Sequence, residues 1–151
     1  MFMGLPFEFS EEKEMTGRAS KRKGSNFENH IMKELREIVP FVGKTLGSGS
    51  SEDNADIDHF GPFLIECKHH RTISEAELVR WWKKIVGQAE PVCKIPVIIY
   101  KENHQPIRVR MIAVIMNTVD IGDYKTWMNG EPGRLVIDMD YESWKNWIRR
   151  K

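Results

Sequence analysis

A short apolar segment that ends in a glutamate and a lysine constrains this chain more than any other part of its sequence. Residues 63–68 read Phe-Leu-Ile-Glu-Cys-Lys, and a short apolar run of this length is typical of a strand. Because side chains alternate between the two faces of a strand, Leu64, Glu66 and Lys68 share one face. An acid and a base therefore project together from the end of an apolar strand.

The segment before this strand adds two further carboxylates. Residues 55–59 and 63–68 predict two short strands joined by a tight Gly-Pro turn. Asp56 and Asp58 lie on one face of the first strand, and a hairpin would bring that face beside Glu66. Clustered carboxylates suit Mg²⁺, which prefers oxygen ligands and keeps several waters.

Glu66 and Lys68 have both a chemical and a plain structural interpretation. A metal ion at the acidic cluster would activate water and neutralise phosphate charge, while Lys68 would stabilise phosphoryl charge or position a water. A Glu-x-Lys strand is also common as an exposed edge with a cross-strand ion pair. The neighbouring Asp56 and the apolar lead-in favour the chemical interpretation.

The remaining patterns predict an α/β fold with a central mixed β-sheet flanked by helices. The first helix is expected to begin after Ser25 and to end at Pro40. The other expected elements are a helix between Ser74, its N-cap, and Pro91; strands over 95–100, 107–116 and 135–139; and a last helix over 141–148 with Asp140 as its cap.

The length of the chain suits one compact domain. With 151 residues, 40% of them hydrophobic, the chain can build a single core. Residues 1–24 show little periodicity and are interpreted as a flexible N-terminal arm, which leaves residues 25–151 as the single domain.

Glu28 is a third candidate carboxylate. It recurs at helical spacing with Met32 and Leu35, so it lies on or beside the apolar stripe of the first helix. A carboxylate there needs a partner, which a metal site could supply. The alternative is a capping box formed by Ser25 and Glu28, and this alone would explain the glutamate.

The distribution of basic residues matters more than the net charge, which is only +1. A cluster near the start could contact DNA phosphates, and its members are Arg18, Lys21, Arg22 and Lys23. The alternative is a solvated tail. The loop that contains Ser48 and Ser50 is rich in glycine and serine and could approach a DNA backbone, or it could be a plain flexible connection.

Other polar and aromatic residues receive more ordinary assignments. Asp138 and Asp140 form an acidic pair without a basic companion and are expected to be surface or capping residues. Neighbouring His69 and His70 point to opposite sides of a strand, so at most one is expected to contact phosphate. Gln88 either supports the acidic site or marks the boundary of a helix face. The tryptophans at 81, 82, 144 and 147 are expected in the core or an interface.

Cysteine content and hydropathy indicate a cytoplasmic protein. Cys67 and Cys93 make neither a disulfide framework nor a metal-binding CxxC pair. The apolar start is followed by glutamates, which do not fit a signal peptide. The longest apolar run, residues 111–116, is too short to span a bilayer.

The sequence resembles the PD-(D/E)XK (restriction-endonuclease-like) nuclease superfamily, and within it the archaeal-type Holliday-junction resolvases. Residues 21–28 read Lys-Arg-Lys-Gly-Ser-x-x-Glu and look like the opening of these resolvases. The Gly-Ser loop, Ala-Asp-Ile at 55–57 and Leu-Ile-Glu-Cys-Lys at 64–68 follow in the family's order. The resemblance covers residues 18–116.

The resemblance implies roles for individual residues. Glu28, Asp56 and Glu66 would be the acidic metal-site residues, and Lys68 would be the catalytic lysine. Ser48 or Ser50 would match a serine of the resolvases' catalytic loop. The basic cluster, together with Ser25, would contact DNA.

The resemblance also implies a cofactor and partners. The expected activity needs Mg²⁺, for which Mn²⁺ can substitute, and the expected protein is a homodimer that nicks a four-way DNA junction symmetrically during recombination or repair. A two-fold junction calls for two active sites.

The chain departs from the resolvase pattern in three places. Ala55 replaces the proline of the motif, and the short interval between Asp56 and Glu66 leaves Asp58 as a rival metal ligand. The sequence also continues past the usual core, over residues 117–151. The helix with two tryptophans and the strand after it resemble phage-type nucleases of the superfamily.

Three other functions stay open on the sequence alone. One is a nuclease of the same fold that cuts duplex or single-stranded DNA. Another is a catalytically silent DNA-binding module. The third is a structural α/β module in which every charge is a surface or capping residue.

Overall fold

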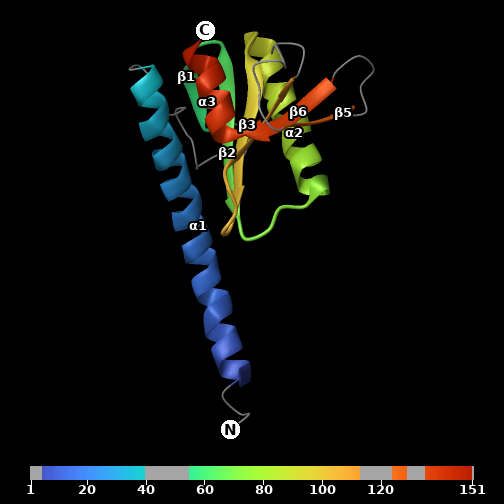
Figure 1. Ribbon diagram of the computed structural model, residues 1–151. Coiled ribbons are helices and arrows are strands. Elements are labelled where there is room, and N and C mark those ends of the chain that lie inside the picture. The colour runs from blue at the N-terminus through green and yellow to red at the C-terminus, as the bar shows by residue number, and fades with distance from the viewer. Residues whose placement is uncertain (1–4, 40–54, 113–123, 129–134, 151) are drawn as a thin grey trace.

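The computed structural model describes residues 5–39, 55–112, 124–128 and 135–150 (Figure 1). Its elements, in chain order, are α1 (Leu5–Ile38), β1 (Ile57–Phe60), β2 (Phe63–His70), α2 (Glu75–Ala89), the 3₁₀ turn η1 (Glu90–Val92), β3 (Ile95–Glu102), β4 (Arg108–Ile112), β5 (Tyr124–Met128), β6 (Leu135–Asp140) and α3 (Tyr141–Arg149).

The strands form one six-stranded sheet in the order β1-β2-β3-β4-β6-β5. β2 and β3 are parallel, because the chain crosses over through α2 between them, and the other neighbours are antiparallel. The predicted hairpins β1–β2 and β3–β4 are both present. The predicted α/β fold with a central mixed sheet is therefore confirmed.

Helices cover both faces of the sheet (Figure 1). α1 and α3 pack on one face, where Ile31 and Trp144 join Ile65 of β2 in a buried cluster. α2 packs on the other face, where Trp82 and Leu64 belong to a second cluster. Odd-numbered residues of β2 thus face α1, and even-numbered residues face α2. This division decides on which side each polar side chain of β2 lies.

The two shorter helices begin where the sequence predicts. The Ser74 hydroxyl accepts a hydrogen bond from the backbone N–H of Glu77 at the start of α2. The Asp140 carboxylate accepts one from the backbone N–H of Ser143 at the start of α3. All four tryptophans expected in the core are buried.

The first helix begins 21 residues earlier than expected, at residue 5 instead of residue 26. α1 runs from Leu5 to Ile38, whereas the apolar stripe predicts a start after Ser25. Residues 5–24 are rich in strong helix formers and hold a proline only in the first turn, where it is tolerated. Apolar periodicity could not reveal this extension, because in Figure 1 the first half of α1 projects beyond the sheet.

The longer helix removes the capping explanation for Glu28. Ser25 lies in the interior of α1 rather than at its start, so the alternative interpretation as a capping box is wrong. Residues 5–24 are helical rather than irregular, while the division into an arm and a nuclease domain stays a prediction.

Two differences concern the strands. The strand expected over 107–116 is β4, Arg108–Ile112, and residues 113–116 lie outside the described part. β5, Tyr124–Met128, was not predicted; it is a short edge strand whose register is fixed only by pairing with β6.

Asp138 is not the surface residue that the sequence predicts. The fully buried Arg110 stands opposite it on β4 and donates to both of its carboxylate oxygens, with Nε at 2.8 Å and Nη2 at 2.9 Å. Nη2 also lies 3.1 Å from Glu75 in the first turn of α2. The basic companion was 28 residues away in sequence, so only the sheet register reveals it.

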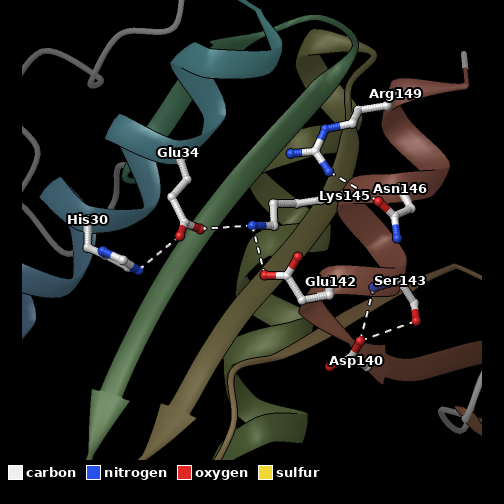
Figure 2. Close-up of polar contacts among 8 residues, drawn as sticks. All are labelled: His30, Glu34, Asp140, Glu142, Ser143, Lys145, Asn146 and Arg149. Atoms are coloured by element: carbon white, nitrogen blue, oxygen red, sulfur yellow. Dashed lines mark hydrogen bonds and ion pairs between the residues drawn. The ribbon is translucent and has the colours of Figure 1, made fainter.

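Ion pairs of the buried Lys145 join α3 to α1 (Figure 2). Lys145 Nζ lies 3.2 Å from Glu34 Oε2 and 2.9 Å from Glu142 Oε1. Glu34 also reaches His30, at 3.3 Å, along α1. Burial acts to raise the pKa of Glu34, but hydrogen bonds from Tyr141 and Lys145, together with the charges of Lys145 and His30, outweigh it and lower this pKa. The two helices on this face are thus connected by charge as well as by apolar packing.

Candidate active site

The predicted pair on β2 is assembled as the alternation of the strand requires. Lys68 Nζ lies 3.1 Å from Glu66 Oε1. Both side chains face α2 and line a small cleft, whose other walls are Trp81, Lys84, Ile85 and Gln88. Glu66 is only 9% exposed, Lys68 is half-buried, and β2 lies between β1 and β3, so the pair is not on an exposed strand edge.

Asp56 is held next to this pair by the backbone of β2. Its Oδ2 accepts a hydrogen bond of 2.7 Å from the N–H of Cys67, and the residue is buried. The hairpin therefore brings Asp56 beside Glu66, as the sequence predicts. The side chain of Asp58, the rival ligand, lies outside the described residues.

The two carboxylates repel each other. Burial, and then the charge of Asp56, raise the pKa of Glu66 to about 7, although Lys68 and Lys84 act to lower it. A carboxylate with its pKa shifted so far, next to a second one in a cleft, is typical of functional sites. A divalent cation between them would offset the repulsion.

Lys68 is held over an aromatic ring. Its Nζ lies 5.3 Å from the centre of the Trp81 ring, within the range of a cation–π interaction. The salt bridge to Glu66 and the contact with Trp81 together fix the position of the ammonium group.

Two α2 residues of the site were not assigned to it from the sequence. Trp81 was expected in the core, and it is buried, but it also contacts Lys68. Lys84 was not singled out. Both share a helix face with Gln88, which lines the cleft as the first of its two interpretations requires. Their spacing of three and four residues was the signal, but only the packing of α2 shows that this face meets Glu66.

Glu28 does not join these carboxylates. Among the described residues, no group of three or more histidine, cysteine, aspartate or glutamate side chains is placed to hold a metal ion. The reason is the layering: α1 packs on the face of Ile65 and Cys67, whereas Glu66 faces α2. Glu28 as a metal ligand stays a prediction, as do Ser48 and Ser50, which lie outside the described residues.

The predicted DNA-binding residues lie along the middle of α1. Arg18, Lys21, Arg22 and Ser25 are exposed. Lys23 is half-buried, and its Nζ donates a 3.0 Å hydrogen bond to Asn103 Oδ1, after β3. The basic cluster is therefore part of a helix fixed against the sheet rather than a free tail.

The two histidines point to opposite faces, as predicted. The ring of His69 lies edge-on to Phe27 of α1 with centroids 5.4 Å apart, and the ring of His70 lies 5.2 Å from that of Trp81 on α2.

Comparison with known proteins places the chain in a nuclease family. Residues 19–131 match the family described as "Phage putative PDDEXK endonuclease". This match covers most of the chain and includes Asp56, Glu66 and Lys68, so the chain belongs to this family of PD-(D/E)XK endonucleases. The predicted superfamily and its phage branch are both confirmed.

A solved structure shows a weaker likeness. It is Hjc, a Holliday junction resolvase from the archaeal hyperthermophile Archaeoglobus fulgidus, with 16% identity and a TM-score of 0.41 over 80% of this chain and 89% of that one. No curated protein matches the chain significantly.

Within the described part of the chain, no helix is long and apolar enough to cross a membrane.

Proposed function

We propose that this protein is a metal-dependent DNA endonuclease that hydrolyses phosphodiester bonds at Glu66 and Lys68. The observation that carries the proposal is the 3.1 Å pair of a buried glutamate and a lysine beside Asp56, in a chain of a PD-(D/E)XK endonuclease family. We also propose a cytoplasmic location, consistent with its DNA substrate.

Asp56 and Glu66 fit a hard divalent cation. Mg²⁺ is commonly held by one or two carboxylates and completes its shell with water, and burial and the charge of Asp56 raise the pKa of Glu66, which a bound cation would oppose. Mg²⁺, or Mn²⁺ in its place, would supply charge neutralisation at the scissile phosphate.

The chain's own residues account for the other requirements of hydrolysis. Asp56 is fixed by the Cys67 N–H, and Lys68 by Trp81 and Glu66, so each charged group is positioned before DNA binds. The Lys68 ammonium can donate to a phosphate oxygen or hold the attacking water. Lys84 adds a second positive charge on the same side as the cleft.

We further propose that the substrate is branched DNA and that the active form is a homodimer. Support comes from the Lys-Arg-Lys-Gly-Ser-x-x-Glu opening of residues 21–28, which resembles that of junction resolvases. A dimer would present two equivalent centres to the two strands that a resolvase nicks.

The test compares a labelled four-way junction with linear duplex of the same sequences, in Mg²⁺. The proposal predicts paired symmetric nicks in the junction and at least ~10-fold slower cutting of the duplex. Lys68→Ala should abolish both activities, while Lys33→Ala, which replaces an exposed lysine of α1, should retain them.

Equal cutting of both DNAs would support a nuclease but contradict the junction preference. Folded protein that binds DNA and cuts neither would indicate a silent binding module.

A further inference from the structure

A basic groove lies on the opposite face of the sheet from Glu66. It has a volume of about 530 Å³ and runs between α1 and the carboxyl ends of β2 and β3. Its charged and titratable walls are Arg22, Lys23, His30, His69 and Lys101, and no aspartate or glutamate among the described residues lines it.

The positive charges in this groove are not neutralised within the described residues. Lys23 donates to the neutral amide of Asn103, and no ion pair among the described residues involves Arg22 or Lys101. Burial and the charges of Lys101 and Lys23 lower the pKa of His69, more than its hydrogen bond with Asn103 raises it. Three cations are therefore gathered without a counter-charge, an arrangement that an anion would stabilise.

The shape of the groove suits a strand better than a single phosphate. Its α1 wall extends from Ala19 to His30, which at 1.5 Å per residue is about 16 Å. At about 3.4 Å per nucleotide, this length matches four or five nucleotides of one DNA strand. The positive groups come from both walls of the groove: Arg22 and Lys23 lie on α1, and Lys101 lies on β3.

The groove and the candidate active site adjoin the same strand ends. Lys68 pairs with Tyr100, and the next pair in register is His69 with Lys101. Successive residues point to opposite faces, so Lys68 serves the cleft under α2 and His69 serves the groove under α1. A DNA molecule that passes over these ends would meet both sites.

We propose that the groove binds the phosphodiester backbone of a DNA segment that flanks the one cut at Glu66. This inference rests on the proposed nuclease function for the cutting site, but binding in the groove needs no metal and no cleavage. It gives the enzyme two separate contacts with DNA, one on each face of the sheet, which a branched or bent substrate can satisfy together.

The experiment measures DNA affinity without chemistry. Binding of a labelled four-way junction is followed by fluorescence anisotropy in EDTA at several salt concentrations, for wild type and for Arg22→Glu/Lys101→Glu. The groove predicts at least ~10-fold weaker binding and a salt slope lower by about two, because two phosphate contacts are lost. Lys33→Glu, on the same helix but outside the groove, makes the single-residue control. It should change affinity by less than about threefold at moderate salt.

A second double variant and a competition measurement keep the test decisive. Arg22→Gln/Lys101→Gln should show about half the effect in the logarithm of affinity, with an unchanged thermal melt. Unchanged affinity and salt slope in both double variants would overturn the proposal, even if their oligomeric state changed. Displacement of DNA by inorganic phosphate at constant ionic strength would also overturn it, by assigning the groove to a single phosphate.

A cleavage assay distinguishes a failure of this inference from a failure of the proposed nuclease function. In Mg²⁺, the double variants should keep the turnover rate of the wild type at saturating DNA while KM rises. If the wild type cuts no DNA, the nuclease proposal fails, and the anisotropy result still decides whether the groove binds DNA. A fall in turnover with unchanged affinity would contradict the groove's role in binding.

Discussion

The position of Glu66 follows from the sequence pattern, but its raised pKa depends on the fold. Strand alternation predicted that Glu66 and Lys68 share a face, and they form a 3.1 Å pair. It could not predict the raised pKa of Glu66, because that depends on burial under α2 and on the charge of Asp56. Trp81 was missed for the same reason: its contact with Lys68 depends on how α2 is rotated about its axis.

The raised pKa makes Glu66 costly for stability at alkaline pH. Its pKa is 4.5 ordinarily and about 7 in the folded protein, so the folded state binds more protons between these values. Stability should therefore fall as pH rises from about 4.5 to 7. Glu66→Gln removes this loss, because the amide never ionises.

The prediction for Glu66→Gln is thus a gain of stability together with a loss of activity. In EDTA at pH 8 the variant should be more stable than the wild type by on the order of 2 kcal/mol, and the difference should shrink towards pH 5. Urea unfolding at both pH values measures it. Glu37→Gln, an exposed site on α1, should show no such trend. A variant less stable than the wild type at pH 8 would contradict the assigned environment of Glu66.

At the scale of elements, local sequence signals predicted the helices and strands whose ends are marked by capping or turn residues. The caps at Ser74 and Asp140, the Gly-Pro turn and the apolar runs all predicted elements that the structure contains. The first half of α1 and the strand β5 were missed. The first half of α1 consists of helix-forming residues but lacks an apolar stripe that faces the core. β5 is recognised only from its pairing with β6.

The connection between α1 and α3 depends on the buried Lys145. Replacing it by methionine leaves Glu34 without its main cation, so Lys145→Met should lower the free energy of unfolding by roughly 2–3 kcal/mol, less than for a fully buried pair because Glu34 is partly exposed. Urea unfolding at pH 7 measures this. Lys83→Met, at an exposed position of α2, should change stability by less than about 0.5 kcal/mol.

The loss of unfolding free energy in Lys145→Met should depend on pH in a direction set by the pKa shifts of Glu34 and Lys145. The pKa of Glu34 is lowered in the folded protein, so its contribution is present above its ordinary value of 4.5 and is lost as pH falls through the lowered value. The pKa of Lys145 is raised, because its bonds to Glu142 and Glu34 outweigh burial, so its contribution is lost only as pH rises above 10.5. The difference between wild type and Lys145→Met should be constant from pH 6 to 9 and smaller at pH 3.5. A difference that grows in acid would contradict this account.

At the scale of the whole molecule, the sheet separates the candidate active site from the basic groove. Glu66, Lys68 and Lys84 line the cleft under α2, and the basic groove lies under α1. Composition could not show this separation, because the net charge of +1 sums over both faces. Sequence did predict the α/β class and the pairing of Asp56 with Glu66. It could not predict that Arg22 and Lys101 would line one groove, since 79 residues separate them.

The most direct test of the central assignment is the nicking of supercoiled plasmid by purified protein. We expect conversion to the nicked form in Mg²⁺ or Mn²⁺ and none in EDTA. Lys68→Ala should be slower by at least ~100-fold with an unchanged thermal melt, while Lys33→Ala should match the wild type. Nicking by Lys68→Ala at the wild-type rate, or undiminished nicking in EDTA, would contradict a metal-dependent centre at Glu66 and Lys68.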